Sequence, residues 1–191
     1  MDHNIKKIIN HTIQVLNDGG SILYPTETIW GIGCDATNVT AIKKIYKIKK
    51  RAQTKKLIIL VDSIRKLNLY LKKVPPIAYK LIKESKKPTT IIYNNPINLP
   101  EILTHNNTIG IRVIKNHDVN IILKHFNKAI TSTSANISSY QNPMNFSEID
   151  DHIKNNVDYI VPINLIQTQQ TKKPSSIIKI NNDGSIKMIR N

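Results

Sequence analysis

Hydroxyl and carboxylate side chains gather in segment 24–36, whose sequence is YPTETIWGIGCDA. A short strand over 21–24 is expected to end there and to open into a loop over 26–34. Because glycine lets a backbone come close to a ligand, the two threonines and Glu27 of this loop could contact a small polar molecule. The same spacing is typical of a capped turn over a buried Trp30, and spacing alone favours that simpler interpretation.

Basic residues follow the helix that is expected over 38–48. Lys49 and Arg51 lie at its end, and Lys55 and Lys56 come soon after. A lysine point charge and an arginine fork could together clamp the polyphosphate of a nucleotide. The alternative is that these residues only complement the negative end of the helix, as many basic runs do.

Segment 131–138 (TSTSANIS) carries a dense set of hydroxyls where a predicted strand ends. Such segments often form simple turns, in which the hydroxyls bond to the nearby backbone. The same donors, combined with backbone amides, can also form an anion-binding nest. Both interpretations are open at this point.

Familiar nucleotide and metal signatures do not occur in the sequence. It contains neither G-x-x-x-x-G-K-[ST] nor G-x-G-x-x-G, so an ATP site would have to be built differently. The six histidines show no H-E-x-x-H or comparable pairing. We therefore expect no metal held by protein ligands.

The composition indicates a globular domain with an aliphatic core, since 40% of the 191 residues are hydrophobic and only 5% are aromatic. The net charge of +15 would attract polyanions, yet the lysines are spread along the chain among Asn and Ile, which argues against one selected face. Cys34 is the only cysteine, which favours a reducing compartment. The start lacks the apolar core of a signal peptide, and the most apolar stretch, 57–61, is far too short to span a membrane. We expect a cytoplasmic protein.

Helical and strand patterns alternate along the chain, which predicts helices packed on a mixed sheet. A closing hairpin around 182–184 adds antiparallel pairing to that sheet. The patterns predict helices over 5–16, 38–48, 64–71, 77–82, 118–126 and within 142–156, strands over 21–24, 57–61, 89–93, 109–114, 129–133, 159–162, 176–180 and 186–189, and polar loops over 94–107 and 167–173.

Four motifs in order carry a resemblance to a known family. They are Y-P-T-[DE]-T-x-[WY]-G-[IL]-G at 24–33, K-x-R at 49–51, G-x-R-V at 110–113 and S-A-N-x-S at 134–138. In this combination the chain resembles the YrdC/Sua5 family of threonylcarbamoyl-AMP synthases, in its short single-domain form, from about residue 8 to residue 190.

The resemblance implies an α/β fold of the α+β type: a YrdC-like sandwich with a twisted mixed sheet, flanking helices and a basic groove. It implies one domain over 1–191, which ends too early for the extra C-terminal domain of the family's long forms. By motif, the resemblance implies nucleotide-phosphate and catalytic contacts from Lys49, Arg51, Ser134 and Asn136, further ATP contacts from Lys55, Thr108, Asn142 and Arg190, and threonine contacts from Thr28, Arg112, Ser132 and Ser175.

The activity implied by the resemblance is synthesis of threonylcarbamoyl-AMP from L-threonine, bicarbonate and ATP. Mg²⁺ would be bound through the ATP phosphates, and a separate transferase complex would use the product to modify tRNA. Ala52, Ser139 and segment 87–90 (KPTT) depart from the family pattern, but none of them removes a proposed ligand. Alternatives are an RNA-binding module, which would bind tRNA directly without synthesis, and an inactive paralogue of the same fold.

Overall fold

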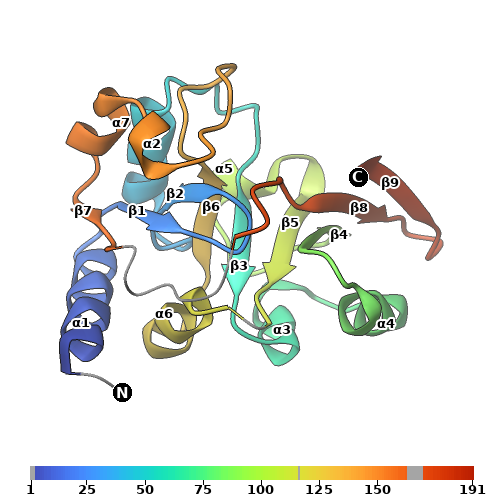
Figure 1. The fold of residues 1–191 in the computed structure, drawn as a ribbon. Coiled ribbons are helices and arrows are strands. Elements are labelled where there is room, and N and C mark those ends of the chain that lie inside the picture. Colours follow the sequence, from blue (N-terminus) through green and yellow to red (C-terminus); the bar gives the residue numbers. More distant parts are fainter. Residues whose placement is uncertain (1–2, 116, 163–169) are drawn as a thin grey trace.

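The computed structural model describes residues 3–115, 117–162 and 170–191, which form alternating strands and helices (Figure 1). The strands are β1 (Ile22–Pro25), β2 (Trp30–Gly33), β3 (Ile58–Val61), β4 (Thr89–Asn94), β5 (Thr108–Val113), β6 (Ile130–Ser134), β7 (Tyr159–Ile160), β8 (Ser176–Ile180) and β9 (Ile186–Arg190). The α-helices are α1 (His3–Asn17), α2 (Val39–Ile48), α3 (Leu67–Tyr70), α4 (Pro76–Glu84), α5 (Glu101–Thr104), α6 (Val119–Phe126) and α7 (Asp151–Asn156), and 3₁₀ turns lie at Ile64–Lys66, His105–Asn107 and Phe146–Glu148.

One mixed sheet joins these strands in the order β7-β1-β2-β6-β3-β5-β4-β8-β9. The pairs β1/β7, β3/β5 and β4/β8 are parallel, and the other neighbouring pairs are antiparallel. The β8/β9 hairpin extends the sheet at the end away from α1 (Figure 1). The mixed sheet predicted from the alternating pattern is confirmed.

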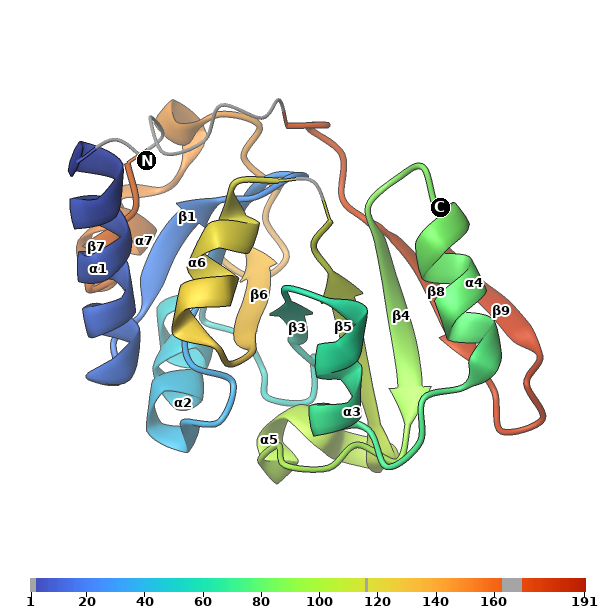
Figure 2. The same ribbon diagram turned by 90° about the horizontal axis from the view of Figure 1, so that it is seen from below.

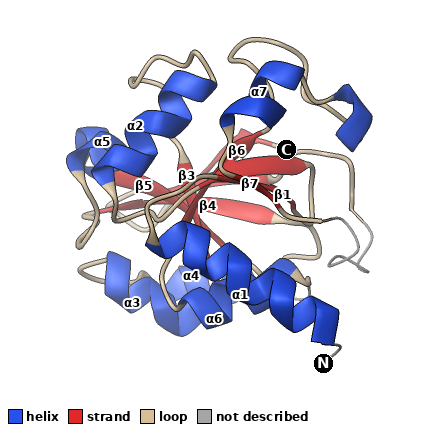
Figure 3. Cartoon of the chain, turned by 90° about the vertical axis from the view of Figure 1, so that its left-hand side faces the viewer, coloured by secondary structure: helices blue, strands red, loops and turns tan. Residues whose placement is uncertain are grey.

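Helices cover both faces of the sheet. Helices α1, α3, α4 and α6 lie on one side, and α2, α5 and α7 lie on the other (Figure 3). The view from below shows the first group spread across its face of the sheet (Figure 2). Buried aliphatic side chains fill both interfaces in two clusters, as the composition predicts.

Helix α2 illustrates how the sequence positions the first basic motif. Its stripe of Ala41, Ile42 and Ile45 is buried against the sheet, and the Asn38 side chain accepts a hydrogen bond from the Ala41 amide at 3.0 Å. The helix ends at Ile48, and Lys49 is its C-cap. The predicted cap and stripe are confirmed, and the helix delivers Lys49 to the end of β6.

Four segments differ from the patterns. Segment 26–34, expected as a loop, contains β2. Its W-G-I-G sequence shows no strand pattern, because two of its four residues are glycines, which are uncommon in strands. Segment 94–107 contains α5 and a 3₁₀ turn, which follow Pro100. Segment 64–71 is broken into a 3₁₀ turn and the single-turn helix α3, and the strand expected over 159–162 is only β7. The predicted polar linker over 167–173 lies partly outside the described residues, which resume at Gln170.

Gly33 is the point where β2 approaches the neighbouring strand most closely. A Cβ atom on Gly33 would lie 2.0 Å from the Thr131 carbonyl oxygen, so no side chain fits unless the backbone moves. Thr131 is also bonded to Cys34: its amide donates to the Cys34 carbonyl at 2.9 Å, and its Oγ1 accepts from the Cys34 amide at 3.0 Å. The glycine of this motif is therefore needed for packing.

We expect Gly33→Ala to lower the free energy of unfolding by about 3 kcal/mol, because the β2/β6 pair must separate to admit a methyl group. Urea denaturation measures the change. Gly184→Ala is the control: Gly184 has φ of +83° but open space around it, so the expected cost is only about 1 kcal/mol. Equal costs at the two positions would contradict the close approach of Gly33.

Candidate active site

A cavity of about 250 Å³ lies on one face of the sheet and is open to solvent. The ends of β2 and β6, the middle of the sheet and the segment before β8 all contribute to its walls. Eight residues expected from the sequence line it: Thr28, Arg51, Arg112, Ser132, Ser134, Asn142, Ser175 and Arg190. The fold thus brings together residues from seven separate parts of the chain.

Four cationic side chains line the cavity, and its described lining includes no carboxylate. Arg51 is held by its own loop, because Nε donates to the Lys55 carbonyl at 2.9 Å and Nη2 donates to the Lys56 carbonyl at 3.0 Å. Lys56 donates from Nζ to the Thr108 hydroxyl at 2.6 Å and also to the His105 carbonyl. This arrangement fixes two positive charges at one end of the cavity.

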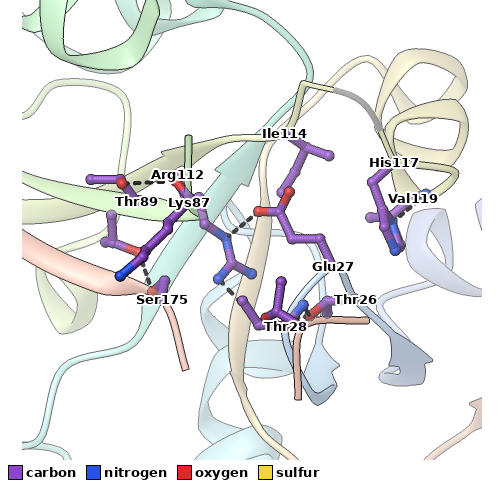
Figure 4. Close-up of polar contacts among 12 residues, drawn as sticks. Thr26, Glu27, Thr28, Lys87, Thr89, Arg112, Ile114, His117, Val119 and Ser175 are labelled. Atoms are coloured by element: carbon purple, nitrogen blue, oxygen red, sulfur yellow. Dashed lines mark hydrogen bonds and ion pairs between the residues drawn. The ribbon is translucent and has the colours of Figure 1, made fainter. Parts of the chain in front are cut away.

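Arg112 supplies the charge deepest in the cavity wall. The side chain is almost fully buried; its Nε lies 3.3 Å from Glu27 Oε1, and its Nη1 donates to the Thr28 hydroxyl at 3.4 Å (Figure 4). Burial lowers the pKa of Arg112, and the charge of Glu27 opposes that change. Burial likewise raises the pKa of Glu27, against the effects of Arg112 and Lys115. The carboxylate therefore compensates and orients a guanidinium that would be costly to bury alone.

The fourth cation, Arg190, closes the site from the end of β9. Its Nε and Nη2 atoms both donate to the Ser175 carbonyl, at 3.0 and 2.8 Å. The Ser175 hydroxyl is 2.9 Å from the Thr90 hydroxyl, which anchors the segment before β8 to β4. The charge of Arg190 also lowers the pKa of Arg112, which places the two guanidinium groups within electrostatic reach of each other.

Segment 170–172 crosses the loop that carries Thr28. The Gln170 side chain donates to the Thr26 carbonyl at 2.8 Å, the Thr171 amide donates to the Glu27 carbonyl at 3.0 Å, and the Lys172 amide donates to the Thr28 carbonyl at 2.9 Å. These three hydrogen bonds fix the backbone of the loop over 26–28. They hold Thr28 and Glu27 against Arg112.

Lys49 lies behind the cavity instead of lining it. The side chain is fully buried, and Nζ donates to the Ser134 carbonyl, to the Asn136 carbonyl at 2.6 Å and to Asn136 Oδ1 at 3.2 Å. Burial, helped by the charge of Arg51, lowers the pKa of Lys49 to about 7. The ammonium form, which the three acceptors select, and the neutral amine are therefore close in free energy near neutral pH. Lys49 shapes the loop over 134–136.

We expect Lys49→Met to lower the free energy of unfolding by about 2 kcal/mol, because the carbonyls of Ser134 and Asn136 lose their buried donor. The methionine keeps the length of the apolar stem. Thermal unfolding measures the change, and Lys47→Met, an exposed lysine on α2, is the matched control. If both variants unfold at the same temperature, Lys49 does not support the loop.

Three more residues expected from the sequence lie beside the cavity without appearing in its described lining. The Asn136 side chain accepts from the Ser134 hydroxyl at 2.5 Å and donates to the Tyr140 carbonyl at 2.6 Å. Lys55 donates from Nζ to the Ser139 hydroxyl at 3.3 Å, and Thr108 accepts from Lys56. The Asn136 and Thr108 side chains thus support residues that line the cavity, whereas Lys55 supports Arg51 through its backbone carbonyl.

Sequence reasoning missed Lys56 as a site residue and also missed the apolar wall. Lys56 was visible only as part of a basic run, whereas Ile29, Trp30 and Ile58 looked like core. The alternation of β3 does not single out Ile58, since Leu60 on the same face of the strand is fully buried core. Thr26 had been named only as one of the two threonines of the loop over 26–34, and the lining residues that were missed are Ile29, Trp30, Gly31, Lys56, Ile58, Thr133, Pro174 and Ile177.

This arrangement suits a ligand with negative charges and a flat or apolar part, since four cations and several hydroxyls face an aliphatic and aromatic wall. Across the described part of the chain, no three His, Cys, Asp or Glu side chains come together as metal ligands would. Within residues 3–115, 117–162 and 170–191, every helix falls short of the length or apolar character that crossing a bilayer requires. Fold and site thus define an α/β protein with an open cavity lined by four cations.

The chain belongs to the Sua5/YciO/YrdC family, because the family model, which carries the description "Telomere recombination", matches residues 14–191. A relative from Methanocaldococcus jannaschii, named a putative threonylcarbamoyl-AMP synthase, is 34% identical over 179 residues, covering 93% of this chain and 83% of its own length. The threonylcarbamoyl-AMP synthase of Buchnera aphidicola subsp. Baizongia pistaciae is 34% identical over 170 residues, covering 87% of this chain and 89% of its own.

Two solved structures share the fold. E. coli YciO superposes with a TM-score of 0.81 at 22% identity, covering 97% of this chain and 89% of its own. P. abyssi Sua5 in complex with L-threonine superposes with a TM-score of 0.79 at 24% identity, covering 90% of this chain and 50% of its own. The chain therefore corresponds to half the length of that Sua5, and the expected α/β sandwich is confirmed.

Proposed function

We propose that this chain is an L-threonylcarbamoyladenylate synthase, a nucleotidyltransferase that forms threonylcarbamoyl-AMP and pyrophosphate from L-threonine, bicarbonate and ATP. The observation that carries the proposal is the open cavity with four cations and no carboxylate in its described lining. The names of the relatives from two organisms support the same activity.

The nucleotide would occupy the end of the cavity near the S-A-N loop. Arg51, Lys56 and Arg190 would neutralise its phosphates, and the hydroxyl of Ser134 and the amide of Asn142 would donate or accept at its edges. Lys49, Lys55, Thr108 and Asn136 would contribute by fixing these groups, and a polyphosphate bound nearby would favour the charged form of Lys49.

Threonine would occupy the other end, against Arg112. Its carboxylate would accept hydrogen bonds from the guanidinium, which uses only part of its five N–H groups on Glu27 and Thr28. The hydroxyls of Thr28, Ser132 and Ser175 would bond the polar groups that remain. The apolar wall would exclude water from the reacting atoms.

Mg²⁺ suits this cavity if the nucleotide brings it. The described lining offers hydroxyl and amide oxygens but no carboxylate, and Mg²⁺ is commonly held by substrate phosphates with few protein ligands. When bound, the ion would neutralise phosphate charge. Ser134 and Asn142 are the side chains placed to approach it.

The reaction requires positioning more than a protein nucleophile. The threonine amine attacks the carbon of bicarbonate or carbon dioxide and gives a carbamate, with water as the by-product from bicarbonate and a proton released to solvent from carbon dioxide. A carbamate oxygen then attacks the α-phosphorus, and the bond to the bridging oxygen breaks to release pyrophosphate. The cationic side chains would stabilise the charge on the departing pyrophosphate, and Arg112 would hold the carbamate in line.

Partners and location follow from the chemistry of the product. A mixed anhydride of this kind is reactive, so a separate transferase complex would take it up and pass the group to tRNA. Direct binding of tRNA to this chain would aid that transfer. The chain would act in the cytoplasm, where ATP, threonine and tRNA are available together.

Pyrophosphate release tests the proposal. Purified protein with ATP, magnesium and fresh bicarbonate should release pyrophosphate when L-threonine is added, and a Lys49→Ala/Arg51→Ala variant should lose that release. Folded protein that binds RNA in a salt-dependent manner but releases no pyrophosphate with threonine would contradict the synthase and favour a binding module.

A further inference from the structure

A second cavity of about 250 Å³ lies on the other face of β5 from the candidate active site. Ile111 and Val113 line it, whereas Arg112 between them lines the first cavity, as alternation along a strand requires. Glu27 also faces the second cavity, so the Glu27–Arg112 ion pair forms the wall between the two. Apart from Glu27, the described lining of this second cavity contains none of the candidate site residues named from the sequence.

The second cavity has a strong excess of positive charge. Lys86, Lys87 and Lys115 line it, and Glu27, whose charge is compensated by Arg112, is the one acid in its described lining. The ammonium groups of Lys86 and Lys87 are exposed and make no hydrogen bond or ion pair within the described residues. Lys115 is held at the rim, because its Nζ donates to the Ser85 carbonyl at 3.2 Å. The ammonium groups of Lys86 and Lys87 are therefore available to bind an anion.

His117 provides a neutral donor inside the same cavity. The side chain is buried, and its Nδ1 accepts a hydrogen bond from the Val119 amide at 3.2 Å, so the hydrogen of the neutral ring is on Nε2. That Nε2 has no hydrogen-bond partner within the described part of the chain. Burial, helped by Arg112 and opposed by Asp118, lowers the pKa of His117 to about 4, which keeps the ring neutral at physiological pH. A buried donor without a partner is rare and is explained if a ligand accepts from it.

We propose that this second cavity binds a small phosphate-class oxyanion, with Lys86, Lys87 and Lys115 at the rim and the His117 Nε2–H as an inner donor. The oxygens of such an anion can accept from several donors at once, and its multiple charge matches three separate ammonium groups better than a carboxylate would. Free phosphate and pyrophosphate share this chemistry. The proposal is independent of the synthase activity, since the residues that would bind the anion line the second cavity and not the first.

The test follows the His117 ring by NMR during titration with potassium phosphate, pyrophosphate or acetate at constant ionic strength, with the resonance assigned through bonds. We expect a saturable shift of the His117 Cε1–H signal with phosphate or pyrophosphate and little shift with acetate. The anion with the lower Kd is the one that the cavity prefers. Lys86→Met/Lys87→Met should weaken binding about tenfold. Arg51→Ala/Lys56→Ala, which alters only the first cavity, should leave the His117 titration unchanged.

A matched loss of charge elsewhere controls for general electrostatics. Lys43→Met/Lys47→Met removes two exposed lysines from α2 and should leave the titration as in the wild type. The proposal is overturned if neither phosphate nor pyrophosphate moves the His117 signal saturably. It is also overturned if the Lys86→Met/Lys87→Met variant binds as well as the wild type, or if the two lysine variants weaken binding equally.

Discussion

Replacement of Arg112 by alanine is expected to lower threonine-dependent pyrophosphate release at subsaturating threonine by about 100-fold, which corresponds to about 2.7 kcal/mol. The loss should appear mainly in the KM for threonine, because the guanidinium is proposed to bind the carboxylate in the ground state as well as in the transition state. The Kd for ATP should change less than about threefold. Steady-state kinetics with threonine varied, together with calorimetric titration of ATP, measure both quantities.

The Glu27–Arg112 pair supplies the controls. Arg112→Ala leaves Glu27 half-buried without its partner, so Arg112→Ala/Glu27→Gln removes that charge and separates misfolding from loss of binding. Glu27→Gln alone keeps the guanidinium but frees it from its ion pair, and we expect an intermediate rise in the KM for threonine. An Arg112→Ala variant that is folded and has a normal threonine requirement would remove Arg112 from the threonine site.

Loss of both cations at the other end of the cavity is expected to act on the nucleotide. Arg51→Ala/Lys56→Ala should raise the KM for ATP by about 100-fold, since two charge-assisted contacts to phosphate are lost at about 1.4 kcal/mol each. Binding of threonine alone should change little, because Arg112 and Thr28 keep their contacts. Kinetics with ATP varied, and titration with threonine alone, distinguish the two effects.

The paired variant Lys43→Ala/Lys47→Ala removes the same net charge from the exposed face of α2 and is the matched control. We expect its KM for ATP to remain close to the wild-type value. A comparable rise in both double variants would mean that the overall positive charge, and not the placement of Arg51 and Lys56 in the cavity, governs nucleotide binding.

Local sequence patterns predict much of this fold, because caps and stripes are local properties. The Asn38 cap, the left-handed Gly19 after α1 and the turn at Gly184 each follow from the residue that occupies the position. Strand β2 is the exception. Its glycines serve a close approach to a strand about one hundred residues away, and no local pattern reveals that partner.

The sequence motifs predict most residues of the candidate site, but they do not predict which side chains face the cavity. Eight of the expected residues line one cavity, but the basic run at 49–56 does not show which side chain faces it. Lys49 turns inward to the carbonyls of the loop over 134–136, while Lys56 reaches the cavity. The pairing of Glu27 with Arg112 depends on strand order and could not be found from spacing.

Direct detection of the product tests the central claim most closely. Protein incubated with ATP, magnesium, L-threonine and isotopically labelled bicarbonate should give a short-lived compound that contains the label, threonine and AMP, seen by rapid chromatography with mass spectrometry. We expect this compound to form only when threonine is present and to be lost in the Arg112→Ala/Glu27→Gln variant. Folded wild-type protein that binds ATP and threonine but never incorporates the label would contradict the synthase assignment.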